Sequence, residues 1–199
     1  KFSALAFKED FEESIKKVSD LGFDGAELAV RNPNDLKVDD VINIIKENNL
    51  EVPAIGTGQA YGEEGLSFSN PDEVIRKMAV DRINNQIVFA SHFDAQVIIG
   101  LIRGIINENV DKIKAEEWTL DCLRKCTEFA KEYNIRLTLE PVNRYESNFI
   151  NTLNEGIEFI KRVGASNLGL LADTFHMNIE EISIYDSVTQ AKDYITHVH

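Results

Sequence analysis

Short apolar runs alternate along the chain with stretches in which apolar residues recur every three or four positions. The short runs predict buried strands, and the spaced positions predict amphipathic helices. The predicted strands are residues 2–6, 24–30, 51–56, 96–100, 136–140, 168–173 and 196–199. The predicted helices are residues 10–21, 38–49, 70–87, 116–133, 152–163 and 184–195, and residues 59–69 are expected to form a loop.

Two of the predicted helices carry start signals. Asn70 is expected to cap a helix in which Pro71 takes the first position and Glu73 completes a capping box. Thr152 and Glu155 have the spacing of a second capping box.

The alternation of strands and helices predicts the fold class. Seven strands and six helices in strict order indicate an α/β protein with a parallel sheet and right-handed crossovers. The turn at residues 7–10 contains no glycine, which disfavours a dinucleotide-binding sheet. The pattern favours a (β/α)8 TIM barrel, which has eight strands and typically about 250 residues. We therefore expect one domain, residues 1–199, that is an incomplete barrel: it breaks within strand seven and lacks the C-terminal β/α unit.

Composition and charge limit the classes of partner that the protein is expected to have. The net charge of −13 argues against nucleic acid, because duplex binding needs clustered Lys and Arg. The apolar runs are far shorter than the roughly 18 residues of a membrane span. The start of the chain, residues 1–7, is too short for a signal peptide, so a cytoplasmic protein is expected. Cys122 and Cys126, four positions apart, are expected to be core thiols.

Candidate chemistry lies at the ends of the predicted strands, where barrel enzymes place their active sites. Strand five ends in Glu140, strand six in Asp173 and strand seven in His199. Alternation directs these three side chains inward at one rim. Taken singly, each is explained as a solvated strand-end charge or a core histidine, but three in register on adjacent strands favour a metal site.

The type of metal follows from the ligands. A site with oxygen and nitrogen donors and no thiolate suits Mn²⁺, Mg²⁺ or Co²⁺, and Zn²⁺ can also bind to it. We expect the bound ion to be Mn²⁺. Arg103, after strand four, is the one cation predicted at this rim. Two interpretations stay open for it: a contact to a substrate phosphate or terminal hydroxyl, and an ion pair with a loop carboxylate.

Several stretches resemble a known family. They are residues 56–62, 98–104, 139–146, 151–152, 172–180 and 197–199. Together they are similar to the ketose 3-epimerase branch (tagatose and psicose 3-epimerases) of the sugar isomerase/epimerase family, within the xylose isomerase-like barrels. The resemblance covers the whole chain, and its most specific parts surround Glu140 and Asp173.

The resemblance implies a divalent metal held by four side chains. Glu140, Asp173 and His199 match three of them, and the fourth is a Glu on strand eight, which would follow His199. In the family, that Glu and the match of Glu140 are the two acid/base groups. Glu146 and His176 match residues that hydrogen-bond the oxygens of the sugar.

These features predict an isomerase that inverts C3 of a ketose or ketose phosphate through an enediolate, with Glu140 as a catalytic carboxylate and the metal as Lewis acid. Presenting C1 instead would give aldose–ketose isomerisation. Two alternatives are an abasic-site endonuclease of the same barrel superfamily and a non-catalytic, sugar-binding or vestigial copy. The identity of the sugar, its phosphorylation and a homo-oligomeric state are left open.

Overall fold

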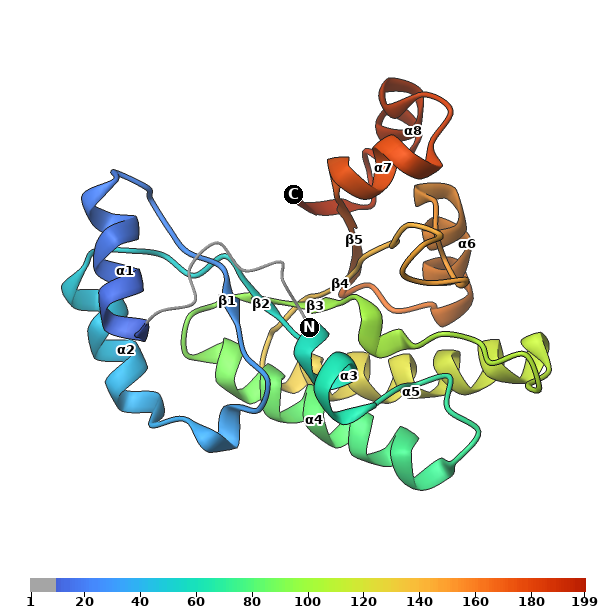
Figure 1. The fold of residues 1–199 in the computed structure, drawn as a ribbon, viewed down its shortest axis with the longest axis horizontal. Helices are drawn as coiled ribbons and strands as arrows, with labels where there is room; N and C mark the ends of the chain where they lie inside the picture. Colours follow the sequence, from blue (N-terminus) through green and yellow to red (C-terminus); the bar gives the residue numbers. More distant parts are fainter. Residues whose placement is uncertain (1–9) are drawn as a thin grey trace.

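The computed structural model describes residues 10–199 and contains one parallel sheet. Its six strands pair in chain order, so each strand neighbours the next along the sequence. They are β1 (Leu28–Ala29), β2 (Ala54–Gly56), β3 (Gln96–Ile99), β4 (Leu137–Leu139), β5 (Leu168–Ala172) and β6 (Ile195–Val198). The sheet curls into part of a barrel with its concave side open (Figure 1). The strand expected at 2–6 lies outside the described residues.

Helices connect the strands and cover the convex face of the sheet. They are α1 (Phe11–Asp20), α2 (Val38–Glu47), α3 (Gly58–Glu64), α4 (Glu73–Ser91), α5 (Lys112–Glu132), α6 (Leu153–Val163), α7 (Thr174–Glu180) and α8 (Ile184–Ala191), with short 3-10 helices η1 (Pro33–Asp35) and η2 (Leu101–Arg103). α1 and α2 form one arm, α4 and α5 lie below the middle strands in this view, and α6 to α8 form the other arm (Figure 1).

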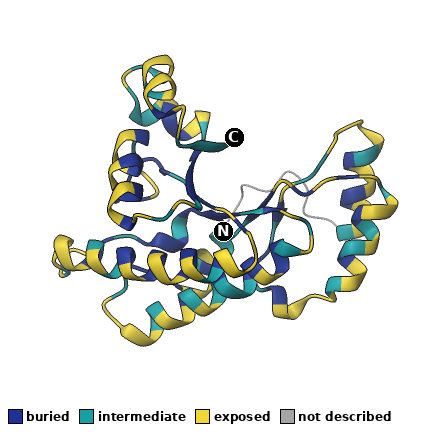
Figure 2. Cartoon of the chain, turned by 180° about the vertical axis from the view of Figure 1, so that it is seen from behind, coloured by how far each residue is buried: buried dark blue, intermediate teal, exposed yellow. Residues whose placement is uncertain are grey.

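The two faces of the sheet are buried in different ways. Alternate strand residues such as Ile55, Val97 and Leu139 are fully buried in the main core between sheet and helices. The opposite, concave face carries a separate small apolar cluster of Ala54, Ile98 and Leu171. Seen from behind, the strands are buried and the outer sides of the helices are exposed (Figure 2). This two-sided burial is the arrangement of a parallel barrel sheet.

The helix start signals are confirmed at one site and wrong at the other. Thr152 and Glu155 form the predicted capping box of α6. α4, however, begins after Asp72, whose carboxylate accepts from the Val74 N–H. The Asn70 side chain accepts instead from the Asp72 N–H, because it closes the turn that leads into the helix. Pro71 therefore precedes the helix.

Two short helices were not predicted. α3 occupies most of the expected loop 59–69, and its two glycines hide it from a propensity argument. α7 starts directly after β5, where no apolar periodicity marks it. None of the described helices is long and apolar enough to cross a bilayer. Cys122 and Cys126 are free and buried in the core, as predicted.

Candidate active site and metal centre

A cavity of about 370 Å³ opens at the C-terminal ends of the strands, on the concave side of the sheet. Apolar residues and glycines form part of its wall. The ionisable side chains that line it are carboxylic acids and imidazoles. They are Glu27, Glu140, Glu146, Asp173, His176 and His199. Among the described residues, neither Lys nor Arg lines this cavity.

Glu140 follows β4 and enters the cavity from the concave face, as the alternation with buried Thr138 predicts. Gly100, which directly follows the neighbouring strand β3, lies beside this side chain: an added Cβ there would be 2.5 Å from Glu140 Oε2. The glycine therefore leaves the space that this carboxylate occupies. Burial raises the pKa of Glu140 to about 7, against the opposing effects of His199 and Arg103.

Asp173 uses its two carboxylate oxygens for different contacts. Oδ1 caps α7 by accepting from the backbone N–H groups of Phe175 and His176, at 2.7 and 3.2 Å. Oδ2 faces the cavity, 3.7 Å from His176 Nε2 and 3.8 Å from His199 Nδ1. Burial raises the pKa of Asp173, but the interactions with His199 and His176 outweigh burial and lower the pKa.

His199 follows β6 and contacts a residue from the opposite edge of the sheet. Its Nε2 donates to Oε2 of Glu27, which directly precedes β1, at 2.8 Å. His197 Nε2 lies 3.2 Å from the same oxygen. Burial raises the pKa of Glu27, but the two imidazoles prevail and lower it to about 2. Asp173, and then Glu27, raise the pKa of His199 to about 10.

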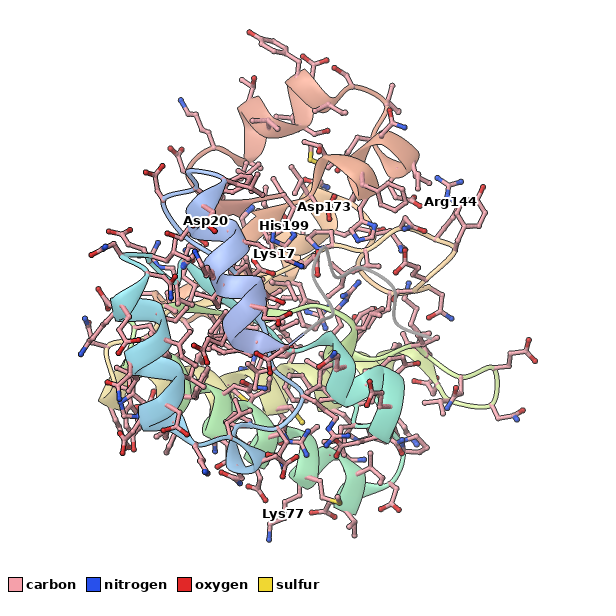
Figure 3. All side chains as sticks on the ribbon, turned by 60° about the vertical axis from the view of Figure 1, so that its left-hand side comes forward. Lys17, Asp20, Lys77, Arg144, Asp173 and His199 are labelled. Carbon is pink, nitrogen blue, oxygen red and sulfur yellow. The ribbon has the colours of Figure 1, made fainter. Side chains whose placement is uncertain are left out.

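Four donor atoms surround one point in the cavity. His199 Nδ1 and His176 Nε2 each lie 3.9 Å from Glu140 Oε1 and 3.7–3.8 Å from Asp173 Oδ2. These separations are too long for hydrogen bonds. Bonds of about 2.0 to 2.6 Å to a common divalent ion would place neighbouring ligands roughly 3 to 4 Å apart. Figure 3 shows Asp173 and His199 side by side at this point.

The donor set fits a divalent cation. Glu140 and Asp173 supply carboxylate oxygens. The Nε2–H bond to Glu27 makes Nδ1 the His199 nitrogen that faces them, and Nδ1 offers its lone pair once an ion displaces its proton. A carboxylate behind a metal-ligating histidine is the usual partner of such ligands. His176 Nε2 is equally near, so two imidazoles compete for the third ligand position.

His176 and Glu146 are joined through Asn143. Asn143 and Glu146 lie in the segment between β4 and α6, and His176 is in the first turn of α7. The Asn143 amide nitrogen lies 2.8 Å from His176 Nδ1 and 2.9 Å from Glu146 Oε1. Burial lowers the pKa of His176. The segment is anchored to α7 by Arg144, on its outer side (Figure 3), whose guanidinium is paired with Glu180 at 2.8 Å.

Arg103 does not lie at the rim, and the expectation of a cation there is wrong. The side chain is fully buried, and its guanidinium donates to the carbonyl oxygens of Gly100, Phe149 and Ile150 at 2.8–3.0 Å. Neither of the two interpretations offered for Arg103, a substrate contact or an ion pair with a loop carboxylate, agrees with these contacts. Burial lowers its pKa to about 10, so it stays charged near neutral pH beneath Glu140.

Sequence reasoning missed Glu27 and Asn143. Glu27 stands inside an apolar run, and its partner His199 is 172 positions away. The one signal was a single carboxylate within a predicted strand. Asn143 lies in a polar loop, where an asparagine is unremarkable.

Comparison with known proteins gives consistent results. The chain is 32% identical over 197 residues to the D-psicose 3-epimerase of Ruminiclostridium cellulolyticum, a match that covers 96% of this chain and 66% of that protein. It is 28% identical to the L-ribulose 3-epimerase of Mesorhizobium japonicum, covering 100% of this chain and 66% of that protein. The chain thus spans about two thirds of the length of these curated relatives.

A solved structure shares the fold. The crystal structure of D-psicose 3-epimerase with D-tagatose, from Clostridium cellulolyticum H10, superposes with a TM-score of 0.83 at 29% identity, covering 96% of this chain and 68% of that one. The family model described as xylose isomerase-like TIM barrel matches residues 15–199. With its parallel, curled sheet and its polar rim, this chain belongs to the xylose isomerase-like TIM barrel family.

Proposed function

We propose that the protein is a divalent-metal-dependent epimerase that inverts C3 of a ketose. The observation that carries this proposal is the convergence of Glu140, Asp173 and His199 around one point in the cavity at the strand ends. The similarity to D-psicose and L-ribulose 3-epimerases supports the reaction type.

In this proposal, Glu140, Asp173 and His199 hold the ion. We expect Mn²⁺, with Co²⁺ or Mg²⁺ as substitutes, because the donors are carboxylate oxygens and an imidazole. A bound divalent ion would supply Lewis-acid polarisation of the substrate carbonyl and would keep Glu140 ionised.

Glu140 is the group we assign to proton transfer. Its carboxylate takes the C3 proton, the electron pair of the C–H bond shifts toward C2, and the carbonyl oxygen receives the charge of an enediolate. Glu146 accepts a hydrogen bond from a sugar hydroxyl, and His176 contacts a sugar oxygen. Return of the proton to the other face of C3 requires a second group, which the family resemblance places after His199.

The lining favours an uncharged sugar over a sugar phosphate. Phosphate recognition most often uses Lys or Arg. The N–H groups at a helix start can also bind phosphate, and among the described residues the start of α3 at Gly58 lines the cavity without a side-chain cap. Arg103 is buried behind the wall, and among residues 10–199 the ionisable groups that line the cavity are carboxylates and imidazoles. The same lining disfavours the phosphate backbone of abasic DNA as a substrate.

The test is an activity panel on the full-length protein, which is expected to carry the second acid/base group after His199. Ketoses are incubated in D₂O with Mn²⁺ or Co²⁺, and exchange at C3 is followed by NMR together with epimer formation. We expect exchange and epimerisation of at least one free ketose, and Glu140→Gln should slow exchange by about 10²- to 10⁴-fold. The matched control Glu132→Gln, at an exposed position on α5, should be neutral.

Three outcomes would overturn the proposal. Washout of a C3 label that persists in Glu140→Gln would remove Glu140 from proton transfer. Sugar binding without exchange in the metal-loaded protein would indicate a non-catalytic binding protein. Cleavage of an abasic oligonucleotide without turnover of any ketose would indicate the endonuclease.

A further inference from the structure

The side-chain amide of Asn143 is buried and uses every polar atom. Its exposed fraction is 1%. Oδ1 accepts from the backbone N–H of Tyr145 at 3.0 Å, and Nδ2 faces His176 Nδ1 and Glu146 Oε1. Because the Tyr145 N–H can only donate, the amide orientation is fixed with its oxygen toward Tyr145 and its nitrogen toward His176.

Two donors therefore point at one nitrogen of His176. One is the Asn143 amide at 2.8 Å, and the other is the Asn143 backbone N–H at 3.4 Å, which is a donor whatever the amide does. Nδ1 must accept, so the ring proton of a neutral His176 lies on Nε2. Nε2 is the atom that faces Glu140 and Asp173 in the cavity.

We propose that Asn143 is a positioning residue that fixes the hydrogen-bonding polarity of the site: it holds His176 as an Nε2–H donor and Glu146 as an acceptor. This inference rests on the proposed function for the role of the two residues toward a sugar. A hydroxyl both donates and accepts, whereas a carbonyl only accepts. A fixed donor and a fixed acceptor therefore define which sugar oxygen each residue receives.

The same contact separates the two imidazoles near the metal point. A protonated Nε2 has no lone pair for a cation, so His176 is left out of the ligand set although it is as close as His199. His199 has the opposite arrangement, because Glu27 holds its Nε2–H, so that Nδ1 is the nitrogen that gives up its proton when an ion binds. One amide and one carboxylate thus assign two similar histidines to different tasks.

The experiment reads the tautomer directly. The full chain is labelled with ¹⁵N-histidine, and long-range ¹H–¹⁵N NMR spectra are recorded with diamagnetic Mg²⁺ and without substrate, with His176→Gln used to assign the signal. We expect a pyridine-type Nδ1 and a pyrrole-type Nε2 for His176. Asn143→Asp replaces the donor by an acceptor of equal size and should move the ring proton to Nδ1.

The matched control is Asn151→Asp. Asn151 lies in the same segment and donates to the carbonyls of Val142 and Ser147, but the structure gives it no contact to His176 or Glu146. It should leave the tautomer unchanged. With a ketose substrate, Asn143→Asp should lower kcat/KM roughly tenfold to a hundredfold, mainly through KM, and more than the control does.

Two results would overturn the inference: a pyrrole-type Nδ1 on His176 in the unsubstituted protein, or a tautomer that stays the same in Asn143→Asp. Because the tautomer is read without substrate, the expected spectra from a protein that turns over no ketose would support the positioning role of Asn143. The lack of turnover would count against the proposed reaction alone.

Discussion

His199 Nε2 lies 2.8 Å from Glu27 Oε2, and this contact joins the two edges of the sheet. Glu27 directly precedes β1 and His199 directly follows β6, the first and last of the strands that the structure describes. The curl of the sheet is therefore what brings these side chains together. The bond fixes which nitrogen of His199 faces Glu140 and Asp173.

Replacing Glu27 should weaken metal binding without removing a ligand. In Glu27→Gln a neutral amide replaces the charged carboxylate that accepts the His199 Nε2–H. Loss of such a carboxylate partner typically lowers metal affinity about 10- to 100-fold. Titration of the metal-free protein with Mn²⁺ measures the change. Glu132→Gln is the control, and equal affinities of the two variants would contradict the role of Glu27.

Metal affinity should rise with pH. The pKa of His199 is raised to about 10 and that of Glu140 to about 7, so protons compete with the ion at both ligands. Between pH 7 and 10 the ion displaces the His199 proton, and below pH 7 it must also displace that of Glu140. The affinity therefore increases as pH rises, most steeply below 7.

Calorimetry of Mn²⁺ binding in buffers of different ionisation enthalpy checks this prediction. We expect release of about one proton or more per ion near pH 7.5. An affinity that is independent of pH from 6 to 8 would exclude His199 and Glu140 as the ligands that exchange protons for metal.

Gly100→Ala should disturb the site through a single carbon atom. The new Cβ would lie 2.5 Å from Glu140 Oε2, so the carboxylate must move. We expect weaker Mn²⁺ binding and at least a tenfold loss of C3 exchange, on the order of the effect of a misplaced catalytic group. Gly62→Ala in α3 is the control, because an added Cβ there meets no atom within 4 Å. Thermal unfolding of both variants separates a displaced carboxylate from a general loss of stability.

Arg103→Met should destabilise the fold. The substitution removes the guanidinium hydrogen bonds to the carbonyl oxygens of Gly100, Phe149 and Ile150. Each carbonyl keeps one other donor, so the loss is that of the charged hydrogen bonds, about 1.5–3 kcal/mol each. We expect the free energy of unfolding in urea to fall by roughly 3 to 5 kcal/mol. Arg136→Met, at an exposed position, should change it by less than about 0.5 kcal/mol. A stable Arg103→Met variant would contradict the bracing role of this side chain.

The strand–helix order could be predicted well from the sequence, because buried positions produce a regular spacing of apolar residues. The runs that became β3, β4 and β5 are mostly apolar and are buried on both faces, as strands between helices and a barrel interior must be. The sequence also predicted Glu140, Asp173 and His199 at one rim, since parallel strands end at the same edge. α7 escaped prediction because its start depends on a cap, Asp173, and not on an apolar stripe.

The parts that could not be predicted depend on contacts between distant residues. Arg103 looks like a rim cation because it follows a strand, but it turns inward toward the carbonyls of Phe149 and Ile150, about 47 positions later in the chain. The pairing of Glu27 with His199 requires the curvature of the whole sheet. Neither of these long-range contacts can be recognised from the local amino-acid composition.

The cap of α7 has a consequence for how the site is assembled. Asp173 fastens the first turn of α7 with one oxygen and presents the other to the cavity, so its position relative to His176 is set within four consecutive residues. This half of the site is encoded locally and can take shape as soon as the turn forms. The half that contains His199 and Glu27 waits for the two edges of the sheet to meet. Ion binding would thus report on the long-range curling of the sheet, and the α7 turn would already be in place beforehand.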